Sequence, residues 1–150
     1  MKILLQEPNG NSKIDLRVTK LNDYSLIEKI TNLIGSKNLL LDEPSLARNS
    51  IDAFRRFRNN ADSDKSAKVL AVVTPSSTQE VANIIKLANN ENIAVVPHGG
   101  GTGVMGAITP MQDCLSVDLR NMNKVLNISY EDRTATVEAG IILADLEFSL

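Results

Sequence analysis

One stretch decides the fold, Pro97-His98-Gly99-Gly100-Gly101-Thr102-Gly103-Val104-Met105-Gly106. It holds five of the eight glycines in the chain. Glycine loses the most conformational entropy on folding, so such a cluster needs left-handed backbone angles or close approach of a ligand to the backbone. The apolar run at 93–96 predicts a strand that leads directly into this loop. We therefore interpret the loop as a cradle for a diphosphate.

The residues before the loop alternate between strand and helix patterns. The continuous apolar run at 69–73 is typical of a strand buried on both faces. Ser77 and Glu80 have the spacing of a capping box, and the apolar residues that follow predict a helix to about Asn89. Together with the strand at 93–96, these elements form a βαβ unit.

Further elements are predicted on both sides of this unit. We expect a helix at 25–35, a strand at 114–119, a hairpin of strands 125–129 and 134–137, and the start of a helix at 143–150. The last helix pattern stops at its second turn, which predicts a boundary inside a longer domain. The pattern as a whole predicts an α+β fold with the βαβ unit and a further small mixed sheet, truncated at its C-terminus.

The glycine loop contains a literal G-x-G-x-x-G from Gly101 to Gly106. A Rossmann site requires the last glycine to open a helix whose N-terminus takes the pyrophosphate. Only residues 107–113, with Pro110 among them, separate this loop from the next strand, so there is no room for such a helix. A P-loop is also excluded, because no Lys-Ser or Lys-Thr follows.

The loop also lacks cationic side chains, since no Lys or Arg occurs between Ile93 and Asp118. Phosphates held here would be bound by main-chain amides, in the manner of a backbone nest, and by the Thr102 hydroxyl. A flexible glycine-rich turn without a ligand is the alternative.

Composition narrows the class of protein. The chain has 150 residues, a net charge of −2 and no basic excess, so it predicts one domain with no nucleic-acid partner. No run approaches the ~20 apolar residues of a membrane helix, and no signal peptide is evident, so we expect no membrane span and a cytoplasmic location. A single histidine and a single cysteine predict no metal site. Cys114 is interpreted as an apolar core residue.

Four motifs carry a family resemblance, and they occur at 73–81, 96–103, 117–123 and 135–140. Their sequences are Val-Thr-Pro-Ser-Ser-Thr-Gln-Glu-Val, Val-Pro-His-Gly-Gly-Gly-Thr-Gly, Val-Asp-Leu-Arg-Asn-Met-Asn and Ala-Thr-Val-Glu-Ala-Gly. In this order they resemble the PCMH-type FAD-binding domain of the vanillyl-alcohol oxidase and p-cresol methylhydroxylase family. The loop is most similar to that of glycolate oxidase FAD subunits and D-lactate dehydrogenases. The resemblance defines 67–150 as an incomplete FAD-binding domain and 1–66 as an N-terminal helical lead-in segment.

The resemblance implies FAD as the cofactor and assigns residues to its parts. The loop would bind the diphosphate, Pro75 would line the cofactor site, and Glu138 and Gly140 would approach the adenine or ribose. The complete predicted set is Pro75, Pro97, His98, Gly99, Gly100, Gly101, Thr102, Gly103, Gly106, Glu138 and Gly140.

His98 requires separate consideration. Some members of the family attach FAD covalently to a histidine placed just after a glycine pair in this loop. Here Gly101 holds that position, so we expect non-covalent FAD. His98 either donates a hydrogen bond to phosphate or is held by backbone contacts alone. Asp118 is interpreted as a structural residue.

The resemblance further implies an FAD-dependent oxidoreductase that oxidises a small 2-hydroxy acid, of the glycolate or D-lactate type, by hydride transfer to FAD. Another enzyme of the same superfamily, acting on an alcohol, an ether-lipid precursor or a peptidoglycan precursor, is one alternative, and a non-catalytic α/β binding module is another. Substrate binding and the catalytic residues are expected in a C-terminal domain beyond residue 150. We therefore expect residues 1–150 alone to be inactive and to bind FAD weakly or not at all, and the sequence does not define the electron acceptor.

Overall fold

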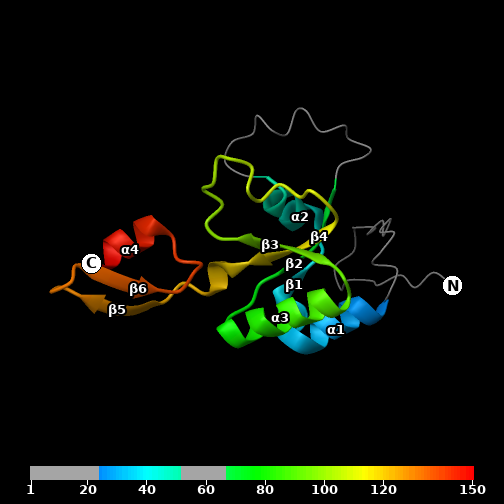
Figure 1. The fold of residues 1–150 in the computed structure, drawn as a ribbon, viewed down its shortest axis with the longest axis horizontal. Coiled ribbons are helices and arrows are strands. Elements are labelled where there is room, and N and C mark those ends of the chain that lie inside the picture. Colours follow the sequence, from blue (N-terminus) through cyan, green and yellow to red (C-terminus); the bar gives the residue numbers. More distant parts are fainter. Residues whose placement is uncertain (1–23, 52–66) are drawn as a thin grey trace, which may run out of the picture.

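The computed structural model describes residues 24–51 and 67–150. Its larger sheet has four strands in the order β1-β2-β4-β3 (Figure 1). These strands are β1 (Leu39–Leu40), β2 (Val69–Val73), β3 (Ala94–His98) and β4 (Cys114–Asp118). β4 pairs in parallel with both β2 and β3, while β1 adds an antiparallel edge to β2. β4 is therefore an interior strand, and every residue in it is buried.

Helices cover both faces of this sheet (Figure 1). α1 (Tyr24–Ile34) and α3 (Thr78–Asn90) lie together on one face, and α2 (Glu43–Asn49) lies on the other. The main core forms between α1, α3 and the sheet, and it is entirely apolar. Its buried residues are Leu26, Ile30, Ile34, Leu70, Ala71, Val73, Ile84, Ala88, Leu115 and Val117. A smaller cluster of Val69, Val72 and Cys114 lies on the other face and packs against Leu46 of α2, among others.

The predicted α+β class is confirmed, and the βαβ unit is present with one difference. β2 and β3 are both parallel to β4, but β4 lies between them, so they are not direct neighbours. The mixed pairing belongs to this larger sheet. The small second sheet, formed by β5 (Val125–Ser129) and β6 (Thr134–Val137), is a purely antiparallel hairpin.

The predicted helix signals act through specific contacts. Gly35 ends α1 with a left-handed φ of 81°, a conformation that glycine adopts without strain. The Ser77 hydroxyl caps α3 by accepting from the backbone N–H of Glu80 at 3.2 Å. The Glu80 carboxylate does not close the box on Ser77 but accepts from the backbone N–H of Ser76 at 2.8 Å. Asn92, with φ at 53°, turns the chain from α3 into β3.

The helix α2 was not predicted from its sequence. It begins after Asp42, whose carboxylate accepts from the backbone N–H of Ser45 at 2.9 Å, with Pro44 in its first turn. At only seven residues, it is too short to show a helical hydrophobic period. Since β1 pairs with β2, the described part of residues 1–66 shares one core with residues 67–150. The assignment of a domain boundary at residue 66 stays a prediction.

Pro97 and His98 lie in a strand rather than in the predicted loop. β3 continues through both residues, and they pair with Val117 and Asp118 of β4. Proline has no N–H to donate and is normally confined to edge strands. β3 is such an edge, because only β4 flanks it. The loop therefore starts at Gly99.

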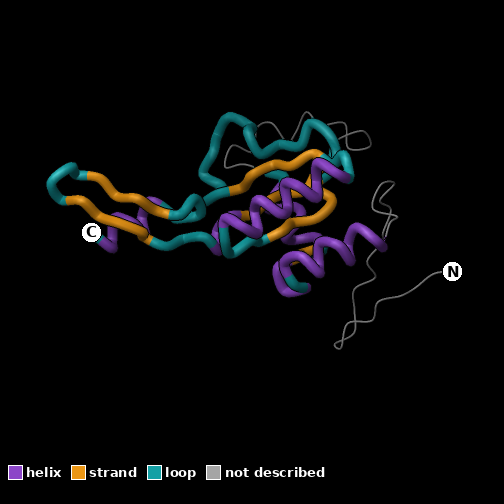
Figure 2. The backbone as a smooth tube through the Cα atoms, turned by 60° about the horizontal axis from the view of Figure 1, so that its bottom comes forward, coloured by secondary structure: helices purple, strands orange, loops and turns teal. Residues whose placement is uncertain are grey.

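The C-terminal elements extend away from the four-stranded sheet (Figures 1 and 2). They comprise β5, β6 and α4 (Leu143–Ser149), and several of their large apolar side chains are exposed. In the described ranges, no helix is both long enough and apolar enough to cross a bilayer.

Replacement of Leu115 tests the packing of the central strand. Leu115→Ala removes a fully buried side chain between the sheet and α1 and α3, and we expect it to lower the free energy of unfolding by about 2–5 kcal/mol. The matched control Leu126→Ala removes the same atoms from an exposed position on β5 and is expected to change stability by less than about 0.5 kcal/mol. Urea unfolding followed by circular dichroism measures both. Equal losses would contradict this account of the core.

Candidate functional site

The loop of residues 99–113 connects the carboxyl end of β3 to the amino end of β4 (Figure 2). It runs on the face of the sheet that carries α2 (Figure 1). Its glycine-rich first half therefore starts at the carboxyl ends of the parallel strands. This edge of an open α/β sheet is the usual place for a ligand.

Three glycines of the loop are not required by the protein itself. A Cβ atom added at Gly99 or Gly100 would come no closer than 3.7 Å to any neighbour, and one at Gly103 would meet nothing within 4 Å. None of the three has a left-handed φ. Neither packing nor backbone conformation explains these glycines, so the uncovered backbone is available to something outside the described residues.

Two other glycines of the loop are required by their conformation. Gly101 and Gly106 have φ angles of 71° and 78°, which other residues adopt only with strain. A Cβ atom on Gly101 would also lie 3.3 Å from both Cε1 and Nε2 of His98. The loop thus folds back so that Gly101 covers one edge of the His98 imidazole.

His98 forms the floor beneath the loop. It is only 3 % exposed, and its backbone pairs with that of Asp118 on β4. Its Nδ1 atom is buried without a hydrogen-bond partner among the described residues. A buried polar atom left in this way costs about 1–3 kcal/mol. Burial lowers the pKa of His98, as do the charges of Arg120 and Arg48, while Asp118 and a hydrogen bond with the backbone of Gly99 oppose them.

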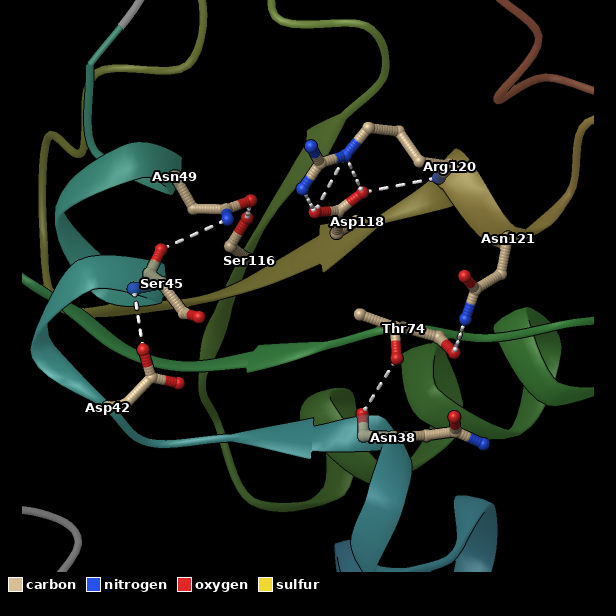
Figure 3. A network of polar contacts seen from close by, with 9 residues as sticks. All are labelled: Asn38, Asp42, Ser45, Asn49, Thr74, Ser116, Asp118, Arg120 and Asn121. Atoms are coloured by element: carbon tan, nitrogen blue, oxygen red, sulfur yellow. Dashed lines mark hydrogen bonds and ion pairs between the residues drawn. The ribbon is translucent and has the colours of Figure 1, made fainter.

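Asp118, whose backbone pairs with that of His98, forms a charged pair with Arg120 (Figure 3). Arg120 Nε contacts Oδ1 at 2.9 Å and Oδ2 at 3.1 Å, Nη2 contacts Oδ2, and the backbone N–H contacts Oδ1 at 3.2 Å. Burial opposes the ionisation of Asp118, but these contacts outweigh it and hold the pKa of Asp118 below its ordinary value. Asp118 is thus an ionised buried carboxylate that organises the turn after β4.

A second buried polar pair lies two residues earlier on the same strand. The Ser116 hydroxyl donates to Asn49 Oδ1 of α2 at 2.9 Å, and Asn49 Nδ2 donates to the backbone carbonyl of Ser45 at 3.1 Å (Figure 3). Together with Asp118, these residues make the α2 face of β4 polar toward its carboxyl end. The sequence prediction missed both pairs. The only available signal was the alternation of Ser116 and Asp118 with apolar residues.

The turn after β4 also holds the carboxyl end of β2 in place. Asn121 Nδ2 donates to the Thr74 carbonyl at 3.2 Å, and the Thr74 hydroxyl donates to the Asn38 carbonyl at 3.3 Å (Figure 3). The backbone N–H of Thr74 also donates to the Asn38 carbonyl, at 2.9 Å. Pro75 follows directly and is fully buried. Its predicted contact with a cofactor stays a prediction, since it presents almost no surface in this structure.

The segment 138–142 lies beside the loop, as the predicted site requires. The Ala139 carbonyl oxygen is 3.8 Å from a Cβ position on Gly99, and the Ile142 side chain is 3.7 Å from one on Gly100. The Glu138 carboxylate accepts from the backbone N–H of Lys124 at 2.9 Å. The structure thus brings this segment to Gly99 and Gly100 from 40 residues away in the sequence.

Gly140 has a structural reason of its own. A Cβ atom there would lie 1.7 Å from the carbonyl oxygen of Leu119 and 2.8 Å from Cα of Arg120. The Gly140 backbone N–H also donates to the Met122 carbonyl at 2.8 Å. Close packing of two backbones therefore explains this glycine. Its predicted contact with the adenine or ribose stays a prediction.

Cys114 is a core residue, as predicted. It is fully buried at the start of β4, and burial raises the pKa of its thiol to about 11. Within residues 24–51 and 67–150, no group of three or more His, Cys, Asp or Glu side chains is arranged to hold a metal ion.

A family model described as "FAD binding domain" matches residues 69–150, more than half of the chain. The chain therefore belongs to this family of flavoprotein domains, and its cofactor is FAD. The match covers the loop, the floor formed by His98 and Asp118, and the segment 138–142.

Individual relatives agree with this assignment. Alkyldihydroxyacetonephosphate synthase from Dictyostelium discoideum is 38 % identical over 82 residues, which are 53 % of this chain and 13 % of that protein. Mitochondrial D-2-hydroxyglutarate dehydrogenase from Arabidopsis thaliana is 32 % identical over 124 residues, 83 % of this chain and 21 % of that protein. The solved structure of p-cresol methylhydroxylase with substrate bound shares the fold, with a TM-score of 0.68 at 22 % identity over 87 % of this chain and 24 % of its own. The predicted resemblance is thus confirmed, and the chain spans a quarter or less of these three proteins.

The loop geometry fits the cofactor. A diphosphate needs backbone amides and uncovered space, and Gly99, Gly100 and Gly103 leave that space beside the exposed Thr102 hydroxyl. FAD, when bound there, supplies the redox chemistry. The loop residues of this chain would supply binding and orientation.

Alanine substitutions at Gly140 and Gly103 test whether protein packing requires glycine at each position. Gly140→Ala forces two backbones apart and is expected to lower the free energy of unfolding by at least about 3 kcal/mol. Gly103→Ala enters open space and is expected to leave stability unchanged or raise it by up to about 1 kcal/mol. Thermal and urea unfolding of the two variants measure the contrast. A large destabilisation by Gly103→Ala would show that protein packing explains that glycine after all.

Proposed function

We propose that this chain is the FAD-binding part of a flavin-dependent oxidoreductase that oxidises a small 2-hydroxy acid by hydride transfer to FAD. One observation supports the cofactor-binding role: the fold does not require glycine at three loop positions, and their backbone is uncovered. The substrate class is supported by the likeness to D-2-hydroxyglutarate dehydrogenase, which extends over most of the chain.

The residues of this chain would hold and orient the cofactor. The backbone of residues 99–103 would bind the diphosphate, with His98 as its floor and Ala139 at its side. The pair of Asp118 and Arg120 would keep the floor in place from below. No described residue is assigned a catalytic role, because substrate binding and the catalytic base are proposed to lie in other parts of the protein.

A second candidate is an enzyme that acts on an ether-lipid precursor. The likeness to alkyldihydroxyacetonephosphate synthase supports it, since its identity is higher, at 38 % over 82 residues. Turnover of the flavin-loaded full-length protein, rather than of residues 1–150 alone, with glycolate and D-lactate under anaerobic conditions separates the two. Bleaching of the flavin absorbance by a 2-hydroxy acid supports the first proposal, and no bleaching by any 2-hydroxy acid favours the second.

FAD titration of the 150-residue chain tests the diphosphate site. The sequence alone left weak binding and no binding open, but the uncovered backbone of Gly99, Gly100 and Gly103 favours weak binding. We therefore expect saturable binding with a micromolar or weaker Kd, because the loop would hold the diphosphate while the flavin ring is left largely uncovered. Gly103→Val fills the space above the backbone and is expected to weaken binding by about tenfold or more, which corresponds to about 1.4 kcal/mol. Isothermal titration calorimetry measures both constants.

The control for this titration is Ala107→Val, which adds bulk to the same loop outside the stretch from Pro97 to Gly106. It is expected to bind FAD like the parent chain. Sub-micromolar binding by the parent would contradict the expected weakness. The absence of saturable binding at millimolar FAD would contradict the diphosphate site.

Non-covalent attachment has its own test. His98 and Cys114 are the only histidine and cysteine of the chain, and both are buried. We therefore expect all flavin to be released when the FAD-loaded protein is precipitated with acid. Flavin absorbance of the supernatant and fluorescence of the denatured band on a gel measure this. A fluorescent band would show a covalent bond.

A further inference from the structure

The buried histidine under the glycine loop faces three charged side chains from three different elements. Asp118 belongs to β4, Arg120 to the turn η3 (Leu119–Asn121) that follows it, and Arg48 to α2. Burial is the largest influence on the pKa of His98 and disfavours a protonated imidazole, and the two arginines act in the same direction. Asp118 and the backbone of Gly99 favour the protonated form. A further negative charge near the ring would therefore also favour protonation.

The contacts of Asp118 explain why Nδ1 of His98 has no partner. An ionised carboxylate offers about four lone-pair positions to hydrogen-bond donors. Arg120 alone makes four contacts to the two oxygens of Asp118, through its backbone N–H and its guanidinium. Asp118, the carboxylate beside His98 in the described part of the chain, is therefore fully used, and Nδ1 is buried without a hydrogen bond to any described residue.

The opposite edge of the imidazole meets the loop. Cε1 and Nε2 lie directly under Gly101, in the middle of the segment proposed to receive the diphosphate. An anion in that segment adds negative charge close to the ring and stabilises the imidazolium form. The ring thus links the loop above it to the charged pair beside it.

We propose that His98 is a positioning residue of the cofactor site, whose imidazole takes up a proton when a diphosphate occupies the loop, with Asp118 as its counter-charge. This rests on the proposed function of the loop. Without a ligand, the neutral ring supports Gly101 in its left-handed conformation. With a diphosphate bound, the protonated ring offsets the negative charge of the ligand. The loop has no cationic side chain for this purpose, since no Lys or Arg occurs between Ile93 and Asp118.

Coupling of proton uptake at His98 to diphosphate binding determines how the binding affinity changes with pH. Proton uptake on binding makes the affinity rise as the pH falls through the pKa that His98 has in the complex. A rise of that pKa by one unit on binding corresponds to about tenfold tighter binding at low pH than at high pH. In the ligand-free protein the sign is reversed, because a pKa below the ordinary 6.5 gives stability that is complete above that pH and is lost as the pH falls.

The single histidine of the chain makes this measurable by NMR. In the untagged 150-residue chain, the Cε1–H group of His98 gives one imidazole signal that needs no assignment. We would titrate it from pH 5 to pH 8 with and without saturating ADP-ribose. This probe carries the same doubly esterified diphosphate as FAD, so its charge stays constant over this range, and it lacks the flavin ring. We expect ADP-ribose to raise the titration midpoint of His98 by about one pH unit.

Variants separate positioning from mere packing. His98→Gln keeps a polar side chain and is expected to remove the tenfold pH dependence of ADP-ribose affinity. Arg120→Gln leaves Asp118 free to accept from His98 and is expected to raise the midpoint in the ligand-free chain. The control Arg133→Gln removes one positive charge from the turn of the distant β5–β6 hairpin and is expected to change neither.

Each other outcome overturns the inference in a distinct way. If ADP-ribose binds but the His98 midpoint does not move, or if the pH dependence persists in His98→Gln, His98 is a packing residue and the proposed function stands. If neither ADP-ribose nor FAD binds at any pH, the diphosphate site itself fails, and the proposed function fails with it.

Discussion

The pairing of β4 between β2 and β3 is the constraint on which the rest of the structure depends. β4 is buried on both faces, but the faces differ in polarity. Leu115 and Val117 enter the apolar core under α1 and α3, whereas Ser116 and Asp118 point into a polar layer under α2. Because parallel pairing aligns the carboxyl ends, Asp118 arrives beside His98, and the loop after β3 starts above both. The same strand that completes the core therefore also builds the floor of the cofactor site.

The glycines in the described part of the chain separate into two physical classes: those that the fold requires and those that it does not. Gly35, Gly101 and Gly106 have left-handed backbones, and Gly140 packs against the carbonyl of Leu119, so the fold explains all four. Gly99, Gly100 and Gly103 have neither property. Folding these three glycines costs conformational entropy, yet no contact or backbone angle within the described residues requires glycine there. We propose that a bound diphosphate uses this uncovered backbone, and the cofactor of the matched family, FAD, contains one.

Local signals in the sequence predicted most elements, and long-range pairing produced the differences. The cap at Ser77, the stop at Gly35 and the hairpin all depend on neighbouring residues, and all are confirmed. The strand order could not be derived in this way, because the partners in β2 and β4 are about 45 residues apart. For the same reason Pro97 and His98 looked like loop residues, since only pairing with β4 makes them a strand. The contact between Arg120 and Asp118 was missed because its significance depends on the buried His98, which only strand pairing brings next to Asp118.

Two relatives with different reactions are both similar to this chain, so the shared residues do not by themselves determine the substrate. Alkyldihydroxyacetonephosphate synthase and D-2-hydroxyglutarate dehydrogenase bear names of different reactions, yet both are similar to this chain, one over 82 residues and the other over 124. We propose that the residues shared with both serve cofactor binding, because the family model that matches residues 69–150 of this chain is described as an FAD binding domain. The backbone cradle fits that role, because main-chain amides recognise a diphosphate regardless of the substrate at the flavin. A change of substrate would then leave the glycines and their floor untouched, and it would be made by side chains that reach the reactive ring.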